Sequence, residues 1–232
     1  MAEIEGVMFD FSGTLFKYQC EPGWLDELTA TMSVADAHQI AAVTGHIGSL
    51  DQRAGMLPSE MFAAWEKRDL DPWRHRLAYL ALLRAVGADR PGVAEILYGQ
   101  MINPSCWQPY PDTLRALRLL ARAHLRVAIV SNISLDIRAV LRRYRASRLV
   151  SEVVMSYVEG VTKPDPRIFR IACQRIGARP ERTLMIGDDE ATDGGAAVLG
   201  IRVVLVQRLS MVDGSHAVLD ALTECGLIDS SH

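Results

Sequence analysis

The chain has 232 residues, of which 49% are hydrophobic and 23% charged, with a formal net charge of -3 at pH 7. This apolar content excludes an intrinsically disordered chain, and 17 glycines with 10 prolines exclude a long coiled coil. The slightly acidic balance argues against a protein that binds nucleic acid through a basic surface. No apolar run is long enough to cross a bilayer, and the first residues lack the pattern of a secretory signal, so we expect a cytoplasmic protein that contacts no membrane.

The four cysteines lie far apart, at positions 20, 106, 173 and 225, and none forms a C-x-x-C pair. This spacing is typical of reduced, mostly buried thiols and not of a zinc site or a disulfide framework.

The first part of the chain predicts one strand followed by helices. An apolar run over 4–9 predicts a short strand that stops at Asp10. From 16 to 105 the signals are helical: Ser33 can cap one helix, and Asp71-Pro72 opens another that carries an apolar stripe as far as Val86.

From residue 106 onward, short apolar runs alternate with helix signals. The runs at 127–130, 153–155, 184–186 and 203–206 suit strands that are buried on both faces of a parallel sheet. Asp112 and Asp165-Pro166 are positioned to cap the helices that follow them. Alternation of this kind predicts an α/β fold, a Rossmann-like doubly wound parallel sheet. We expect this core to comprise 1–15 and 106–232, with 16–105 inserted as an α-helical cap domain.

Polar side chains follow the predicted strands where each one ends. Asp10 and Thr14 come after the first strand, Ser131 and Asn132 after the second, and Lys163 after the third. Asp188, Asp189 and Asp193 follow the fourth. Because ligands of open parallel sheets bind beyond the carboxyl ends of the strands, we expect these groups to share one site.

Carboxylates that crowd together need a cation, and oxygen ligands with spare coordination positions suit Mg²⁺. In such a site Lys163 and the Ser131 hydroxyl would hold phosphoryl oxygens, and Asp10 would attack phosphorus to form an aspartyl-phosphate. The expected partner is therefore a small phosphorylated molecule.

These segments together resemble the four motifs of the haloacid dehalogenase superfamily, hydrolases that are mostly phosphatases, in the subgroup with a helical cap after the first motif. The matching segments are Asp10-Phe11-Ser12-Gly13-Thr14-Leu15, Val127 to Asn132, Thr162-Lys163-Pro164-Asp165-Pro166-Arg167-Ile168-Phe169, and Gly187-Asp188-Asp189 through Asp193.

The resemblance implies roles for individual residues. Asp10 would be the nucleophile, and Ser131 and Lys163 would bind phosphate, with Thr14 and Asn132 as further phosphate contacts. Asp10, the main-chain carbonyl of Ser12 and Asp188 would hold Mg²⁺. Asp193 would support the metal or orient Lys163.

Position 12 departs from the family pattern. Phosphatases of this family carry a second Asp there, which protonates the leaving group and then activates water, whereas this chain has Ser12. Three interpretations stay open. The substrate has a leaving group that needs no proton, or another acid such as Asp189 or a residue of the cap supplies it. The intermediate is hydrolysed slowly, or catalysis is lost and the chain is a binding or regulatory protein.

Two other branches of the family also lack that second Asp. Metal-independent 2-haloacid dehalogenases carry Tyr there, but Asp188 would have no task in their reaction. Phosphonoacetaldehyde hydrolases need a lysine in the cap, and Lys67 is surrounded by charged residues typical of a solvated helix face.

Overall fold

The computed structural model describes residues 3–21, 23–30, 32–45, 47–207 and 216–229. It divides into two compact units, Met1–Lys17 with Pro109–His232 (the core unit) and Tyr18–Gln108 (the inserted unit). These boundaries lie two and three residues from those expected from the sequence.

The core unit is built on a five-stranded sheet in the order β5-β4-β1-β6-β7, and all of its strand pairs are parallel. Because β1 lies in the centre, the residues that follow it are flanked by the ends of β4 and β6. The predicted α/β doubly wound sheet is confirmed. The strands are β1 Gly6–Phe9, β4 Arg126–Ser131, β5 Glu152–Met155, β6 Thr183–Gly187 and β7 Arg202–Leu205.

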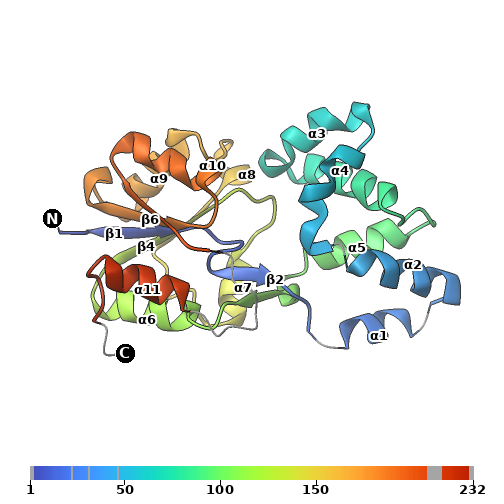
Figure 1. The fold of residues 1–232 in the computed structure, drawn as a ribbon, viewed down its shortest axis with the longest axis horizontal. Coiled ribbons are helices and arrows are strands. Elements are labelled where there is room, and N and C mark those ends of the chain that lie inside the picture. The colour runs from blue at the N-terminus through green and yellow to red at the C-terminus, as the bar shows by residue number, and fades with distance from the viewer. Residues whose placement is uncertain (1–2, 22, 31, 46, 208–215, 230–232) are drawn as a thin grey trace. The chain divides into compact units, whose positions relative to one another are not determined.

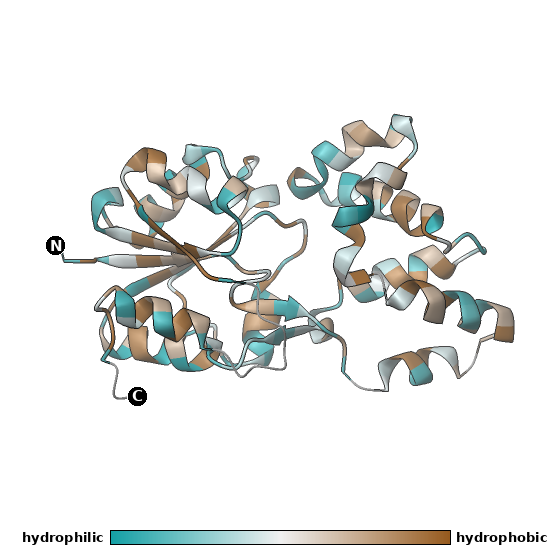
Figure 2. Cartoon of the chain, viewed as in Figure 1, coloured by the Kyte–Doolittle hydropathy of each residue, from teal (hydrophilic) through white to brown (hydrophobic). Residues whose placement is uncertain are grey.

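Helices cover both faces of this sheet (Figure 1). Alternate strand residues, among them Met8, Val130 and Met185, pack with α9 in one buried cluster. In the central strands β1, β4 and β6 most intervening residues are also buried, because α6 and α11 lie on the opposite face. The central strands are accordingly mostly hydrophobic (Figure 2). The helices of this unit are α6 Thr113–Arg122, α7 Arg138–Arg143, α8 Ser156–Glu159, α9 Pro166–Ile176, α10 Glu190–Asp193 and α11 Ala217–Glu224, with short 3-10 helices η5 Pro180–Arg182 and η6 Gly194–Leu199.

The inserted unit is helical and has its own core. Its central helix α4 contributes Leu80, Leu82 and Leu83 to a buried cluster that also contains Ile40 and Leu97. Asp71 and Ser33 cap α4 and α2 as the sequence predicts. The α-helices are α1 Trp24–Thr29, α2 Val34–Thr44, α3 Phe62–Glu66, α4 Pro72–Ala85 and α5 Val93–Met101. The 3-10 helices are η1 Ile47–Met56, η2 Ser59–Met61, η3 Arg68–Leu70 and η4 Pro104–Cys106.

Two short strands, which the sequence pattern did not predict, lie where the chain passes between the units. β2 (Phe16–Tyr18) pairs with β3 (Trp107–Pro109) in a two-stranded sheet. Beside them Cys20 and Cys106 form a disulfide, so the prediction of reduced thiols is wrong for these two residues. The spacing gave no sign of the pair because the two cysteines lie 86 positions apart in the chain. Cys173 and Cys225 are free and buried, as expected.

Asp112 differs from its predicted role. Its side chain makes no capping hydrogen bond to its own helix α6. It accepts hydrogen bonds from the backbone N–H groups of Val218 and Leu219, at 2.9 and 3.2 Å, and so caps the distant helix α11. Among the described residues, no helix is long and apolar enough to span a membrane.

Candidate active site

The site lies at the carboxyl edge of the sheet in the core unit. Asp10 directly follows β1 and is anchored by its backbone N–H, which donates to the Ile186 carbonyl at 3.0 Å. Phe9 pairs with Ile129, so Ser131 at the end of β4 lies one residue further along than Asp10. Asp188 follows β6, and Lys163 lies in the loop between α8 and α9.

Lys163 joins two of the acidic residues through its side chain. Its Nζ lies 2.6 Å from Oδ1 of Asp10 and 2.6 Å from Oδ1 of Asp193. All three side chains are buried, so both ion pairs are shielded from solvent. An ammonium held between two carboxylates in this way has a fixed position and its charge is not screened.

Burial raises the pKa of the Asp10 carboxyl to about 6, while the positive charge of Lys163 opposes this rise. Burial likewise disfavours the Lys163 ammonium, but the two carboxylates outweigh that effect and raise the pKa of Lys163. The lysine therefore stays charged near neutral pH.

Asp193 uses both of its carboxylate oxygens within the protein. Oδ1 accepts from Lys163, and Oδ2 accepts from the backbone N–H groups of Asp188 and Asp189, at 3.1 and 3.3 Å. Fully buried, it ties the lysine to the loop that carries Asp188. Of the two roles expected for Asp193, these contacts correspond to orienting Lys163.

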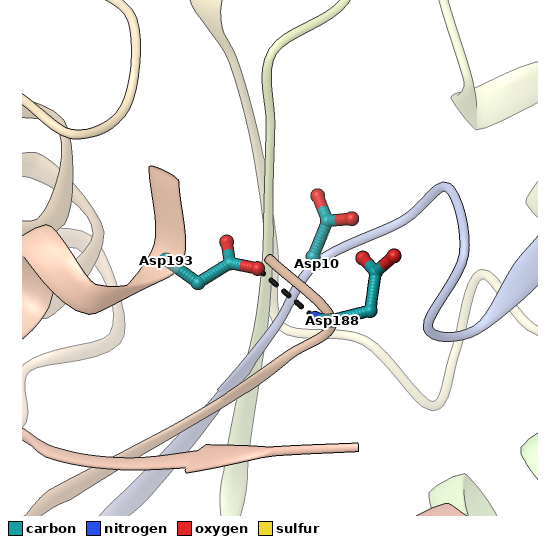
Figure 3. Close-up of side chains that lie close together, drawn as sticks. All are labelled: Asp10, Asp188 and Asp193. Carbon is teal, nitrogen blue, oxygen red and sulfur yellow. Dashed lines mark hydrogen bonds between the residues drawn. The ribbon is translucent and has the colours of Figure 1, made fainter. Parts of the chain in front are cut away.

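Asp10, Asp188 and Asp193 form an acidic cluster, with one carboxylate oxygen of each within 4.8 Å of the others (Figure 3). Three carboxylates against one lysine leave two negative charges in excess among these four groups. Because oxygen ligands and excess negative charge suit a divalent cation, the residues present fit Mg²⁺. With Asp193 engaged by Lys163 and the backbone, Asp10 and Asp188 are the side chains best placed to hold it.

The segment after Asp10 forms a tight turn. The Gly13 N–H donates to the Phe16 carbonyl at 2.8 Å, and Gly13 has φ +89. A Cβ at Gly13 would lie 2.4 Å from Oδ2 of Asp188, so a side chain there would displace that carboxylate. Buried Thr14 donates from Oγ1 to Oδ1 of Asp188 at 3.3 Å, whereas Ser12 is exposed. The turn thus contacts the Asp188 carboxylate, whereas Asp193 contacts the Asp188 backbone.

Asn132 makes a pair of hydrogen bonds that the sequence did not reveal. Its Nδ2 donates to the Lys163 carbonyl at 2.9 Å, and its Oδ1 accepts from the Lys163 N–H at 2.7 Å. The side chain that we expected to contact phosphate is thus engaged with the backbone of the lysine. Asp189, the candidate for a replacement acid, accepts from the Ala191 N–H and caps α10.

Two glycines that sequence analysis did not single out also belong to the site. A Cβ at Gly187 would lie 2.0 Å from Oδ2 of Asp193, and a Cβ at Gly195 would lie 2.2 Å from the Pro164 carbonyl oxygen. Gly187 precedes Asp188 in the fourth motif, so the sequence could have indicated that it belongs to the site. No local pattern indicates that Gly195 packs against the loop between α8 and α9 that carries Lys163 (the lysine loop).

Known proteins share sequence similarity with this chain. The chain is 33% identical over 153 residues to a phosphoserine phosphatase of Thermus thermophilus, which covers 64% of this chain and 59% of that protein. It is 31% identical over 121 residues to (S)-2-haloacid dehalogenase 4A of Burkholderia cepacia, covering 52% of this chain and 51% of that protein. The matches thus span between one half and three fifths of these relatives.

Solved structures share the fold across almost the whole chain. A dehalogenase superposes with a TM-score of 0.66 at 21% identity, covering 97% of this chain and 98% of that one. A HAD phosphatase from Thermococcus onnurineus gives a TM-score of 0.61 at 21% identity, covering 96% and 98%. The sequence model of the family of haloacid dehalogenase-like hydrolases matches residues 4–199. The chain therefore belongs to the haloacid dehalogenase-like hydrolases, as the four motifs implied.

Proposed function

We propose that this protein is a Mg²⁺-dependent phosphatase that acts on a small phosphorylated molecule through an aspartyl-phosphate at Asp10. The observation that carries this proposal is the buried Lys163 ammonium, held at 2.6 Å from Asp10 and from Asp193, with Asp188 completing an acidic cluster. A cytoplasmic location is part of the same proposal.

Each residue has a task in the proposed reaction. A carboxylate oxygen of Asp10 attacks phosphorus, the bond to the leaving oxygen breaks, and water then hydrolyses the acyl phosphate. Lys163 and the Ser131 hydroxyl bind phosphoryl oxygens, and Lys163 neutralises charge that develops there. Asp193 and Thr14 keep Lys163 and Asp188 in place. Asp10, Asp188 and the Ser12 carbonyl would hold Mg²⁺, which supplies charge neutralisation at the phosphoryl group when bound.

The phosphatase is favoured over a dehalogenase on electrostatic grounds. Displacement of halide from carbon needs Asp10 and a positive charge, which Lys163 provides. It gives no task to Asp188, whose carboxylate crowds Asp10 and makes that site more negative. Phosphoryl transfer with a divalent cation uses the same crowding to hold the cation.

The second candidate is a metal-independent 2-haloacid dehalogenase. It is supported by relatives whose names carry that activity and by a residue other than Asp at position 12. A third interpretation, a binding or regulatory protein with impaired catalysis, follows from Ser12 alone.

One assay separates these functions. With 4-nitrophenyl phosphate, we expect turnover in Mg²⁺ that chelation abolishes, and an adduct with beryllium fluoride. The Asp10→Asn variant should lose activity by about 10⁴-fold or more, because the nucleophile is gone. Asp136→Asn, which changes an exposed carboxylate elsewhere in the core unit, serves as the matched control.

Each alternative predicts a different result. Release of halide from (S)-2-chloropropionate in the presence of chelator would establish the dehalogenase. Absence of turnover on both substrates, with no beryllium fluoride adduct, would leave the binding or regulatory protein.

A further inference from the structure

Asn132 and Lys163 form a reciprocal pair at the edge of the sheet. Regular pairing of β4 with β5 ends at Ser131 and Met155. Directly beyond it, the Asn132 side chain donates from Nδ2 to the Lys163 carbonyl at 2.9 Å and accepts at Oδ1 from the Lys163 N–H at 2.7 Å. The side-chain amide thus makes a pair of hydrogen bonds to the backbone of the lysine loop, as a neighbouring strand does inside a sheet.

We propose that Asn132 is a positioning residue that acts through Lys163, fixing the lysine backbone so that Nζ reaches Asp10 and Asp193. The inference rests on the proposed function only in that Lys163 serves the reaction at Asp10.

The lysine side chain needs such an anchor because it is long and rotates freely about several bonds. Its Nζ must meet two carboxylates at once, each at 2.6 Å. A displacement of the backbone by about 1 Å would break that geometry, and misplacements of this size cost on the order of 10²-fold in rate.

The lysine loop is confined from a second side. Gly195 of η6 approaches so closely that a Cβ there would lie 2.2 Å from the Pro164 carbonyl oxygen. The loop therefore rests against η6 by close packing and is tied to the end of β4 by Asn132. Of these two contacts, the one to Asn132 is made by hydrogen bonds to Lys163 itself.

A direct contact between Asn132 and phosphate is the alternative, and the two roles differ in how they couple to Lys163. If Asn132 acts through the lysine, its removal costs nothing further once the lysine side chain is gone. If Asn132 binds phosphate independently, the two losses add.

The first test is a double-mutant cycle on kcat/KM for 4-nitrophenyl phosphate with Asn132→Ala, Lys163→Met and both together. We expect Asn132→Ala to lower kcat/KM by about 10–100-fold in the native background. In the Lys163→Met background it should change kcat/KM by no more than about twofold. Losses that multiply in the double variant would overturn the proposal.

The second test needs no turnover, so it holds even if the proposed function fails. The chain has three lysines, at 17, 67 and 163, and reductive methylation of each can be followed by mass spectrometry. Lys163 is buried and Lys67 is exposed, so in the native protein Lys67 should react and Lys163 should not. Asn132→Ala should make Lys163 reactive while the rate at Lys67 stays unchanged.

Matched variants keep this result interpretable. Asn103→Ala removes an asparagine whose side chain makes three hydrogen bonds in the inserted unit, two with Ser105 and one with Gln100, and should leave Lys163 protected. Asn132→Asp has nearly the same size and keeps the acceptor for the Lys163 N–H, but cannot donate to its carbonyl. If Asn132→Ala does not fold, Asn132→Asp must itself expose Lys163. Protection of Lys163 equal to the native level in a folded variant overturns the proposal.

Discussion

Ser12 determines which leaving groups the proposed reaction can release. A serine hydroxyl does not donate a proton efficiently at neutral pH, and Asp189 is engaged in capping α10. Lys163 is paired with Asp10 and Asp193. Within the described part of the core unit, these contacts leave the edge of the sheet without an evident general acid. The chemistry therefore favours leaving groups that depart as stable anions.

This predicts a strong dependence on the leaving group. The native protein should hydrolyse 4-nitrophenyl phosphate far faster than an alkyl phosphate, and Ser12→Asp should raise the alkyl phosphate rate by about 10²–10⁴-fold. For 4-nitrophenyl phosphate kcat/KM, which reports formation of the aspartyl-phosphate, should change little, since nitrophenolate leaves without a proton. Ser12→Asn is the isosteric control and should give no gain. Equal native rates on the two substrates would show that another acid operates.

His75 makes the stability of the inserted unit depend on pH. It is buried, and its Nδ1 lies 3.0 Å from the Tyr98 hydroxyl. Burial lowers the pKa of His75 from 6.5 to about 4, with the Arg68 charge acting in the same direction. The unfolded chain therefore binds a proton at a pH where the folded protein does not, and stability falls as pH drops through this interval.

We expect His75 to account for a loss on the order of 3 kcal/mol in the free energy of unfolding between pH 6.5 and 4. Urea denaturation of the native protein and of His75→Gln across this range isolates the effect, because other titrating groups are common to both. Parallel curves for the two proteins would contradict it.

At the scale of elements, the Cys20–Cys106 disulfide closes a loop that contains almost the whole inserted unit. Closing a loop of 86 residues restricts the unfolded chain and stabilises the native state by about 4–5 kcal/mol on chain-entropy grounds. The bond should therefore matter most for the helices between its two ends.

Reduction should accordingly lower the denaturation midpoint of the native protein. A variant with Cys20→Ser and Cys106→Ser should melt at the reduced value and should not respond to reductant. Thiol titration in denaturant should find two thiols before reduction, from Cys173 and Cys225, and four afterwards. Four thiols in the untreated protein would show that the bond does not form.

Helices and strands were predictable from the sequence where a short stretch of residues carries the whole pattern. Each strand of the sheet was expected within two residues of its observed ends, because buried parallel strands are short, continuous apolar runs. The three-residue strands β2 and β3 are too short to show a period. Asp112 looked like a cap for α6 but caps α11, since sequence shows a capping residue's type and not which helix it reaches.

At the scale of the whole molecule, parallel topology made part of the site predictable. Asp10 and Asp188 follow β1 and β6, and Ser131 is the last residue of β4. These neighbouring parallel strands all end at one edge, so the proximity of the three residues follows from strand order. The pairing of Asn132 with Lys163 depends on how a loop packs after α8, which no local pattern encodes. The two contacts of Asp193, to Lys163 and to the backbone N–H of Asp188, were likewise not predictable from a local pattern.

The pairing of β2 with β3 has a consequence for how this protein can be altered. The polypeptide leaves the core unit after Lys17 and re-enters it at Pro109, through strands that are hydrogen-bonded neighbours. An excision of 18–108 therefore needs only a short turn to bridge the gap, and the shortened chain should retain the parallel sheet. Modules with adjoining ends can also be transplanted, so the inserted unit can be exchanged for another without altering the strands of the parallel sheet.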